Sequence, residues 1–159
     1  MNLIVISNAT PIVSLCTVGC ENILQQLFHQ IIIPLAVQQE LCALHKPGAQ
    51  FTKYDWVSVA TVTNQEFVFS LRKDLDAGEA ETIALARQMN ADVVLIDEMA
   101  GYQLAKHFDL PVVRTLSLLK TAKQKQIISE VRPLVEDLIR KGRWYARDVI
   151  ERFLRDLGE

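Results

Sequence analysis

The sequence contains little cysteine, and the cysteines it has do not suggest a disulfide-stabilised protein. There are three of them in 159 residues: Cys16, Cys20 and Cys42. An odd number in a chain of this size argues against a disulfide framework. Cys16 and Cys20 are four residues apart and could contribute to a zinc site, but no Cys-x-x-Cys or His-x3-His pair accompanies them. We therefore interpret the cysteines as small buried hydrophobic residues.

Long hydrophobic segments and low-complexity segments are also missing. The longest apolar runs, such as 31–33, are far too short to span a bilayer, and no basic region precedes the first apolar run at 3–6. We therefore expect a cytoplasmic protein with no membrane partner. Hydrophobic residues make up 50% of the chain and charged residues 23%, which is a globular composition. The length predicts a single domain, 1–159, with helices over about 115–159 packed on it or extending it.

Charge is unevenly distributed along the chain. Residues 1–113 carry 6 basic and 12 acidic side chains, whereas residues 114–159 carry 11 basic and 7 acidic ones. The acidic part could hold a metal ion, and the basic part could face nucleic acid or an acidic partner. The alternative for any single Lys or Arg is an ordinary solvated helix face.

Short apolar strands alternate with segments of helical spacing. The predicted strands are 3–7, 31–33, 56–59, 93–96 and 112–113. The predicted helices are 11–19, 23–28, 34–46, 65–72, 76–89, 98–108, 115–125, 128–139 and 146–157, with a loop over 49–56. This alternation predicts an α/β fold, a three-layer sandwich in which helices cover both faces of a mainly parallel central sheet.

Several residues are suited to begin helices, and others form the apolar face of one helix. Thr10 is the expected N-cap of the first helix, with Pro11 at its first position. Asp76 and Thr115 are the expected caps of two later helices. In the helix over 34–46, apolar residues recur at helical spacing. They are Val37, Leu41 and Leu44.

Polar side chains follow two of the predicted strands. Asn8 comes after the first strand and Asp97 after the strand 93–96. Glu79 lies in the first turn of a helix that starts at the same sheet edge, and Glu40 projects from another. Ligands bind outside the carboxyl ends of the strands in open α/β sheets, and several oxygen-bearing side chains suit Mg²⁺ or Mn²⁺. The four residues together therefore predict a metal site.

Each of these residues also has a local explanation. Asp97 could cap the helix that follows it, and Glu79 and Glu81 could complement a helix dipole. Glu40 could lie on a solvated helix face, and Asn8 could be a turn residue. The prediction of a site therefore depends on the group and not on any one member.

Six segments, in order along nearly the whole chain, resemble the PIN domains of the DUF3368 branch. The first, Ile-Ser-Asn-Ala-Thr-Pro-Ile, is similar to an opening Ile-Ser-Asp-Thr-Ser-Pro-Leu pattern. Another, Leu-Asp-Ala-Gly-Glu-Ala-Glu-Thr-Ile-Ala-Leu-Ala, precedes the Val-Leu-Ile-Asp-Glu segment. The six lie at 6–12, 32–41, 75–86, 94–98, 115–123 and 132–139.

The resemblance implies a nuclease that cuts single-stranded RNA with Mg²⁺ or Mn²⁺ held by acidic residues. It further implies the toxin half of a toxin–antitoxin pair, with an antitoxin protein as partner, and a homodimer. The family's acids fall on Asn8, Glu40, Glu79 and Asp97. The secondary candidates for the site are Glu81, Asp76, Glu98 and Thr10.

Two departures from the family pattern leave a second function open. Asn8 replaces an Asp, so it contributes an oxygen but no charge, and Gly101-Tyr102 stands where the family tends to have an Arg. A non-catalytic or weakened PIN-like module that binds RNA or protein is therefore the alternative. A phosphoacceptor receiver lacks its adjacent acids here, and a Rossmann binder lacks its Gly-x-Gly-x-x-Gly. The expected contacts to RNA or a partner are Lys120, Lys123 and Lys125.

Overall fold

The computed structural model describes residues 2–43 and 45–159, and a five-stranded parallel sheet lies at its centre. Its spatial order is β3-β2-β1-β4-β5, and each neighbouring pair is parallel. This confirms the predicted α/β class, and the strand predicted at 56–59 lies at one edge. The strands are β1 (Val5–Ser7), β2 (Ile31–Pro34), β3 (Val57–Ala60), β4 (Val93–Leu95) and β5 (Val112–Val113).

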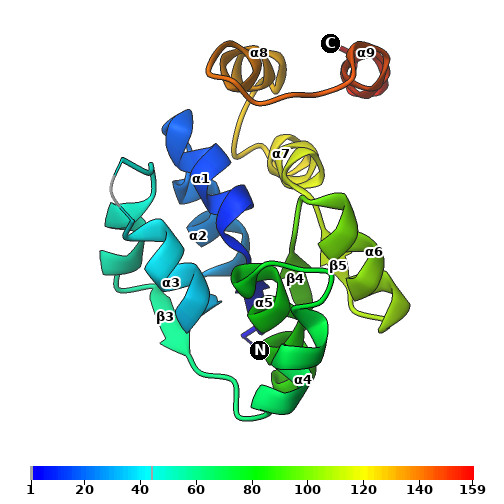
Figure 1. Ribbon diagram of the computed structural model, residues 1–159. Coiled ribbons are helices and arrows are strands. Elements are labelled where there is room, and N and C mark those ends of the chain that lie inside the picture. Colours follow the sequence, from blue (N-terminus) through cyan, green and yellow to red (C-terminus); the bar gives the residue numbers. More distant parts are fainter. Residues whose placement is uncertain (1, 44) are drawn as a thin grey trace.

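Helices surround the sheet on both faces (Figure 1). None in the described part of the chain is long and apolar enough to cross a membrane. The helices are α1 (Ala9–Thr17), α2 (Asn22–Phe28), α3 (Leu35–Leu41), α4 (Gln65–Leu71), α5 (Ala77–Met89), α6 (Met99–His107), α7 (Thr115–Gln124), α8 (Arg132–Arg140) and α9 (Arg147–Asp156), with a 3-10 helix η1 (Ala49–Lys53).

Successive strand residues are buried in two different hydrophobic cores. Val5, Ile31 and Leu95 are buried in one core, together with apolar residues of α1, α2 and α7. Their neighbours Ile6 and Val94 are buried in the other core, with residues of α4, α5 and α6. Side chains on a strand point alternately to opposite faces, so both faces of the sheet are covered. The three-layer sandwich is therefore confirmed.

The last two helices lie at one end of the molecule, beyond α1 and α7 (Figure 1). They are joined to the first core through Val135 and Leu138 of α8 and through Ile150 and Leu154 of α9, all of them buried. Each such side chain contributes roughly 1.5–3 kcal/mol of burial free energy. The segment between α8 and α9 is thereby fixed close to the carboxyl end of the sheet.

The predicted helix over 128–139 is wrong at its start, because α8 begins only at Arg132. The carboxylate of Glu159 accepts hydrogen bonds from the backbone N–H groups of Val131, at 2.8 Å, and Arg132, at 2.7 Å. It therefore caps α8 from a distant part of the chain. Gln126, which has φ 60°, lies in the turn that follows α7 and precedes α8.

The helix α3 ends at Leu41 and not at residue 46 as predicted. Gly48, with φ 111°, lies so close that a Cβ there would be 3.0 Å from Leu41 Cδ2. The chain thus folds back over the end of the helix, and a glycine permits both the approach and the positive φ. Val37 and Leu41 are buried as predicted, whereas the prediction for Leu44 lies outside the described residues.

The predicted loop over 49–56 contains the 3-10 helix η1. Its residue Phe51 is buried and meets the ring of Trp56 edge-on, with 5.1 Å between the ring centroids. Tyr54 stacks on Trp56 at the same separation. Aromatic packing of this kind stabilises the turn, and no helical periodicity in the sequence predicted it.

Two helix starts differ from the predicted ones. Asn8, and not Thr10, occupies the N-cap position of α1, without a side-chain capping bond, and Pro11 is the third helical residue. The Thr10 hydroxyl instead donates to Glu98. Thr115 is the first residue of α7 and not its N-cap.

The three cysteines are free, but they are not equally buried. Cys16 and Cys20 are half-buried and pack against the first core. Burial raises the pKa of each thiol to about 12, which keeps them protonated and unreactive. Cys42 is exposed, so its interpretation as a buried residue is wrong.

Candidate functional site

The candidate site lies where β1 and β4 end side by side. The strands pair in parallel with Ser7 opposite Leu95, and the backbone N–H of Asn8 donates to the Leu95 carbonyl at 2.9 Å. This pairing places Asn8 at the same edge as Asp97 and Glu98, which follow β4. The parallel register therefore brings together residues that are about 90 positions apart in the sequence.

Glu79 is held at this edge by the start of α5. Asp76 caps the helix as predicted, with its Oδ1 accepting the Glu79 N–H at 2.8 Å, and Glu79 Oε2 accepts the Asp76 N–H at 3.1 Å. This reciprocal capping box uses one oxygen of Glu79. The other, Oε1, is buried and has no hydrogen-bond partner among the described residues. Burial raises the pKa of Glu79; the hydrogen bond from the Asp76 N–H lowers it, and the charges of Asp76 and Glu98 raise it further.

Two glycines leave the space that these side chains occupy. A Cβ on Gly78 would lie 3.0 Å from Asn8 Oδ1 and 3.1 Å from Glu40 Oε2. A Cβ on Gly101 would lie 2.9 Å from Glu79 Oε1. One oxygen of Asn8 and one of Glu40 therefore lie close to the same point beside Gly78, in the first turn of α5, and the Glu79 carboxylate reaches the first turn of α6. At the pair 101–102, which departs from the family pattern, Gly101 leaves room for the Glu79 carboxylate.

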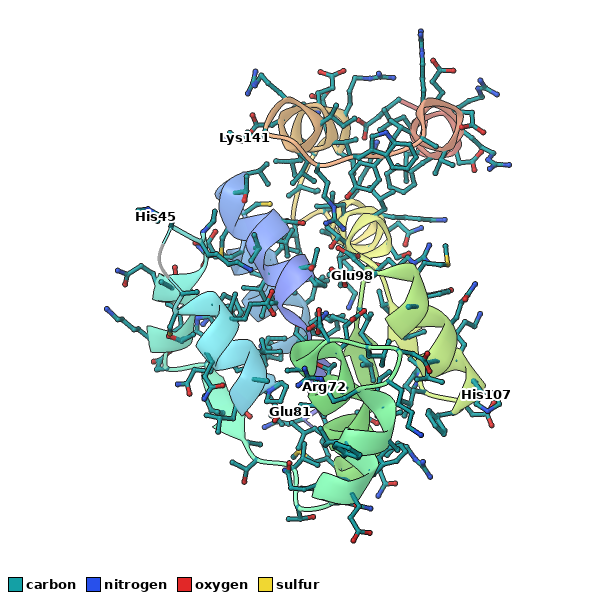
Figure 2. All side chains as sticks on the ribbon, in the orientation of Figure 1. His45, Arg72, Glu81, Glu98, His107 and Lys141 are labelled. Carbon is teal, nitrogen blue, oxygen red and sulfur yellow. The ribbon has the colours of Figure 1, made fainter. Side chains whose placement is uncertain are left out.

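Glu98 is the acid that contacts Asn8 directly. Asn8 Nδ2 donates to Glu98 Oε2 at 3.3 Å, and the Thr10 hydroxyl donates to Glu98 Oε1. Asn8 Oδ1 is buried and unpartnered within residues 2–43 and 45–159. In Figure 2, Glu98 lies in the middle of the molecule, close to the end of α6 that faces α1. Thus the secondary candidates Glu98 and Thr10 belong to the same cluster as Asn8.

Asp97 faces the other way, towards α7. Its Oδ1 accepts the Thr115 N–H at 2.8 Å, and its Oδ2 accepts the Thr115 hydroxyl at 2.6 Å and Arg143 Nη2 at 3.0 Å. The side chain is only 5% exposed. Asp97, which follows β4, therefore caps α7, which follows the neighbouring strand β5. The local alternative, in which Asp97 caps the helix that follows it, is wrong, because α6 has no side-chain cap.

Glu81 lies apart from the other acids. Its Oε2 accepts the N–H of Ala36, in the first turn of α3, at 2.8 Å. Figure 2 shows Glu81 well separated from Glu98, on the side of α5 that faces α3. Glu81 thus stabilises a helix start, while the structure groups Glu79 with the cluster of Asn8, Glu40, Asp76 and Glu98.

Basic residues border the acidic cluster. Lys46 pairs with Glu40 at 3.1 Å, and a cavity of about 310 Å³ beside them is also lined by Lys141 and Arg143. Arg143 lines a second cavity as well, on the side of Asp97. Sequence reasoning missed Lys46, Lys141 and Arg143. The dense run Lys-Gly-Arg-Trp-Tyr at 141–145 was the available signal, because basic and aromatic side chains together are typical of nucleic-acid contacts.

The predicted basic contacts, on α7 and at its C-terminal end, have different surroundings. Lys123 donates to Glu159 at 2.6 Å and to the Leu157 carbonyl at 3.0 Å, so it joins α7 to the segment after α9. Lys120 and Lys125 are exposed. A contact to RNA or to a protein therefore remains a prediction for Lys120 and Lys125, and Lys123 has a structural partner.

The donor set at the sheet edge fits a hard divalent cation in its chemistry. It consists of carboxylate and amide oxygens, and two of them, Asn8 Oδ1 and Glu79 Oε1, are buried without a partner in the described chain. Buried oxygens of this kind favour a bound cation. Residues 2–43 and 45–159 nevertheless contain no three His, Cys, Asp or Glu side chains gathered around one point. Asp97 would have to leave Arg143 or share its oxygens to join the others.

A family model described as DUF3368, PIN domain, matches residues 4–159. No curated protein matches the chain significantly. PIN domains are generally nucleases and typically use divalent metals, so the acidic sheet edge is the candidate active site. Because the match covers nearly the whole sequence, the chain belongs to the PIN-domain family, in its DUF3368 branch.

Proposed function

We propose that this protein is a metal-dependent endoribonuclease that cuts single-stranded RNA at the carboxyl edge of β1 and β4. The observation that carries the proposal is the grouping of Asn8 with Glu40, Glu79 and Glu98 at that edge, with unpartnered oxygens on Asn8 and Glu79. The charges of Glu79 and Glu98 act on each other, and like charges repel unless a cation joins them.

Glu40, Glu79 and Asp97, with Asn8 assisting, would hold Mg²⁺ or Mn²⁺. Bound there, the cation supplies an activated water and stabilises charge on the phosphodiester. The capping box with Asp76 fixes the Glu79 carboxylate in place. Preorganised ligands of this kind cost little reorganisation during the reaction.

The basic residues beside the acids would position the RNA backbone. Lys46, Lys141 and Arg143 line the cavity next to Glu40, and cations there would pair with phosphates and make binding depend on salt. Arg143 borders cavities on both sides, so a strand could cross the acidic edge past it. The family resemblance further supports a toxin role, an antitoxin partner and a homodimer as parts of the proposal.

The proposal is tested by incubating labelled single-stranded RNA with the purified protein in Mn²⁺ and, separately, in EDTA. We expect cleavage in Mn²⁺ only, and a loss of about 10- to 100-fold or more in Glu79→Gln. Glu66→Gln is the matched control, since Glu66 is exposed on α4. Equal cleavage by wild type and Glu79→Gln would indicate a contaminating nuclease.

The alternative is a PIN-like module that binds RNA or protein without cutting. Asn8, which lacks a charge, and Asp97, which is engaged by Arg143, favour it. If the wild type binds the RNA but leaves it intact in Mn²⁺, the binding module is the better description and the nuclease proposal fails.

A further inference from the structure

A second cavity lies on the far side of Arg143 from Glu40. Its volume is about 560 Å³, and it is bordered by α6, α7 and the segment that leads into α9. This size is within the range of small-ligand sites. The residues that matter here are Met99, Arg114, Arg143, Trp144, Tyr145 and Val149. Asp97 also lines it, so the cavity adjoins the acidic edge.

Several apolar side chains on the lining of this cavity are exposed. Trp144 is 82% exposed, and Met99 and Val149 are also exposed. A tryptophan so open to solvent contributes little to folding, whereas its flat ring is a good surface for stacking a base. Only an unpaired base can stack in this way, which favours a single strand over a duplex.

Polar groups of the same cavity have unused hydrogen-bonding capacity. Arg114 Nε, Arg143 Nε and Tyr145 Oη are buried without hydrogen-bond partners in the described chain. Orphan donors of this kind call for an explanation such as a ligand or an ion. An acceptor-rich group such as phosphate would meet them after small side-chain movements.

The charge of the cavity points to an anion. Arg114 lies over the ring of Tyr102, with its Cζ 3.8 Å from the centroid, and forms no ion pair with a described carboxylate. Arg143 is the second guanidinium, and Asp97 is the one acid among the described lining residues. The lining therefore has a surplus of one positive charge beside an aromatic ring.

We propose that this cavity binds one nucleotide of single-stranded RNA, with the base against Trp144 and a phosphate at Arg114 and Arg143. The inference rests on the proposed function for its substrate, and it adds the place where the strand is gripped next to Asp97. Arg143 would then contact both the RNA and the acidic edge.

The test measures binding without cleavage. A fluorescein-labelled single-stranded RNA is titrated with the full chain in EDTA, and anisotropy gives the affinity. We expect Trp144→Ala to weaken binding by at least about fivefold, and Trp144→Phe to keep most of the affinity, because the stacking surface is retained. Phe69→Ala is the control, since Phe69 is 77% exposed but lies on α4, and it should bind like the wild type.

A second variant addresses the phosphate. Arg114→Met keeps much of the apolar side chain and should weaken binding while lowering the salt slope by about one. In the wild type, RNA should also quench Trp144 fluorescence, and Trp144→Phe should lose that quenching while the buried Trp56 remains.

Several outcomes would overturn the subsite. One is the absence of RNA binding by the wild type in EDTA. Another is an unchanged RNA affinity in Trp144→Ala. If that variant, with its RNA affinity unchanged, also shifts from dimer to monomer in sedimentation, the surface mediates contacts between copies of the protein. Loss of affinity in Trp144→Ala by a protein that cuts no RNA would support the subsite and refute the nuclease. Cleavage of RNA by a protein whose RNA affinity is unchanged in Trp144→Ala would support the nuclease and refute the subsite.

Discussion

Arg143 donates a hydrogen bond to Asp97 at 3.0 Å, across 46 positions of sequence. It thereby ties the segment after α8 to the acid that follows β4. The pair is half-buried, with Asp97 almost wholly enclosed. A guanidinium therefore neutralises the residue on which the family resemblance predicts the fourth acid. The charge of the sheet edge thus depends on the C-terminal helices as well as on the acids themselves.

Replacing Arg143 should strengthen cation binding. In Arg143→Gln the positive charge beside Asp97 is lost, which we expect to raise Mn²⁺ affinity about fivefold, since one nearby unit charge contributes ~1 kcal/mol in a solvated setting. Isothermal titration calorimetry measures this affinity. Arg147→Gln, an exposed change whose partner is Glu151 at 2.9 Å, should have no effect. Equal affinities in wild type and Arg143→Gln would show that the guanidinium does not compete with the cation.

Placing a carboxylate at position 8 should make the thermal stability of the protein depend more strongly on the cation. Asn8→Asp would replace the donor that faces Glu98 at 3.3 Å with a like charge, so the melting temperature in EDTA should fall. Mn²⁺ should then raise that temperature more than it does in the wild type. Differential scanning calorimetry with and without Mn²⁺ gives both values. Asn64→Asp is the matched control, because Asn64 caps α4 and Asn and Asp cap almost equally well; a similar Mn²⁺ response in both variants would contradict the prediction.

A methyl group at position 101 should disturb the Glu79 carboxylate. In Gly101→Ala the new Cβ would meet Glu79 Oε1 at 2.9 Å and Ile96 Cγ2 at 3.0 Å. Overpacking of this kind costs about 1–3 kcal/mol, which exceeds the gain in helix propensity of about 1 kcal/mol. Urea unfolding should show lower stability, and the Mn²⁺-induced rise in melting temperature should shrink. Gln103→Ala, on the exposed face of α6, should leave both unchanged; a stabilised Gly101→Ala protein would refute the steric argument.

The Glu159 carboxylate should make stability fall in acid. Its burial would raise the pKa, but Lys123 and the N–H groups of Val131 and Arg132 lower it to about 2 from an ordinary value near 4.5. A group with a lowered pKa stabilises the fold when charged, so its contribution is complete above about pH 4.5 and is lost as the pH falls to about 2.

Glu159→Gln should therefore be less stable than the wild type at pH 7, by about 1 kcal/mol for a weakened cap, and the difference should narrow below pH 4.5. Urea unfolding monitored across pH measures it, with Glu66→Gln as the control. A difference that stays constant from pH 7 to pH 2.5 would contradict a charge-dependent cap.

Some local predictions succeeded because their causes lie within a few residues. Asp76 caps α5 as predicted from its place before the helix, and the apolar run at 93–96 contains the interior strand β4, Val93–Leu95. Others failed where a distant partner intervenes. Thr10 does not cap α1, since its hydroxyl bonds to Glu98, and α8 starts late because Glu159 caps it.

The alternation of apolar strands and helical segments was enough to predict the layered fold and the strand ends that carry polar side chains. Apolar alternation sets the two faces of the sheet, and parallel pairing puts Asn8 and Asp97 at one edge whatever the details. The contacts of each acid, in contrast, depend on the packing of the folded chain. Asp97 turns to Thr115 and Arg143, and Glu81 to α3, because a side chain's partners depend on how helices far apart in the chain pack together. The surroundings of the acids therefore could not be read from the residues that precede and follow them.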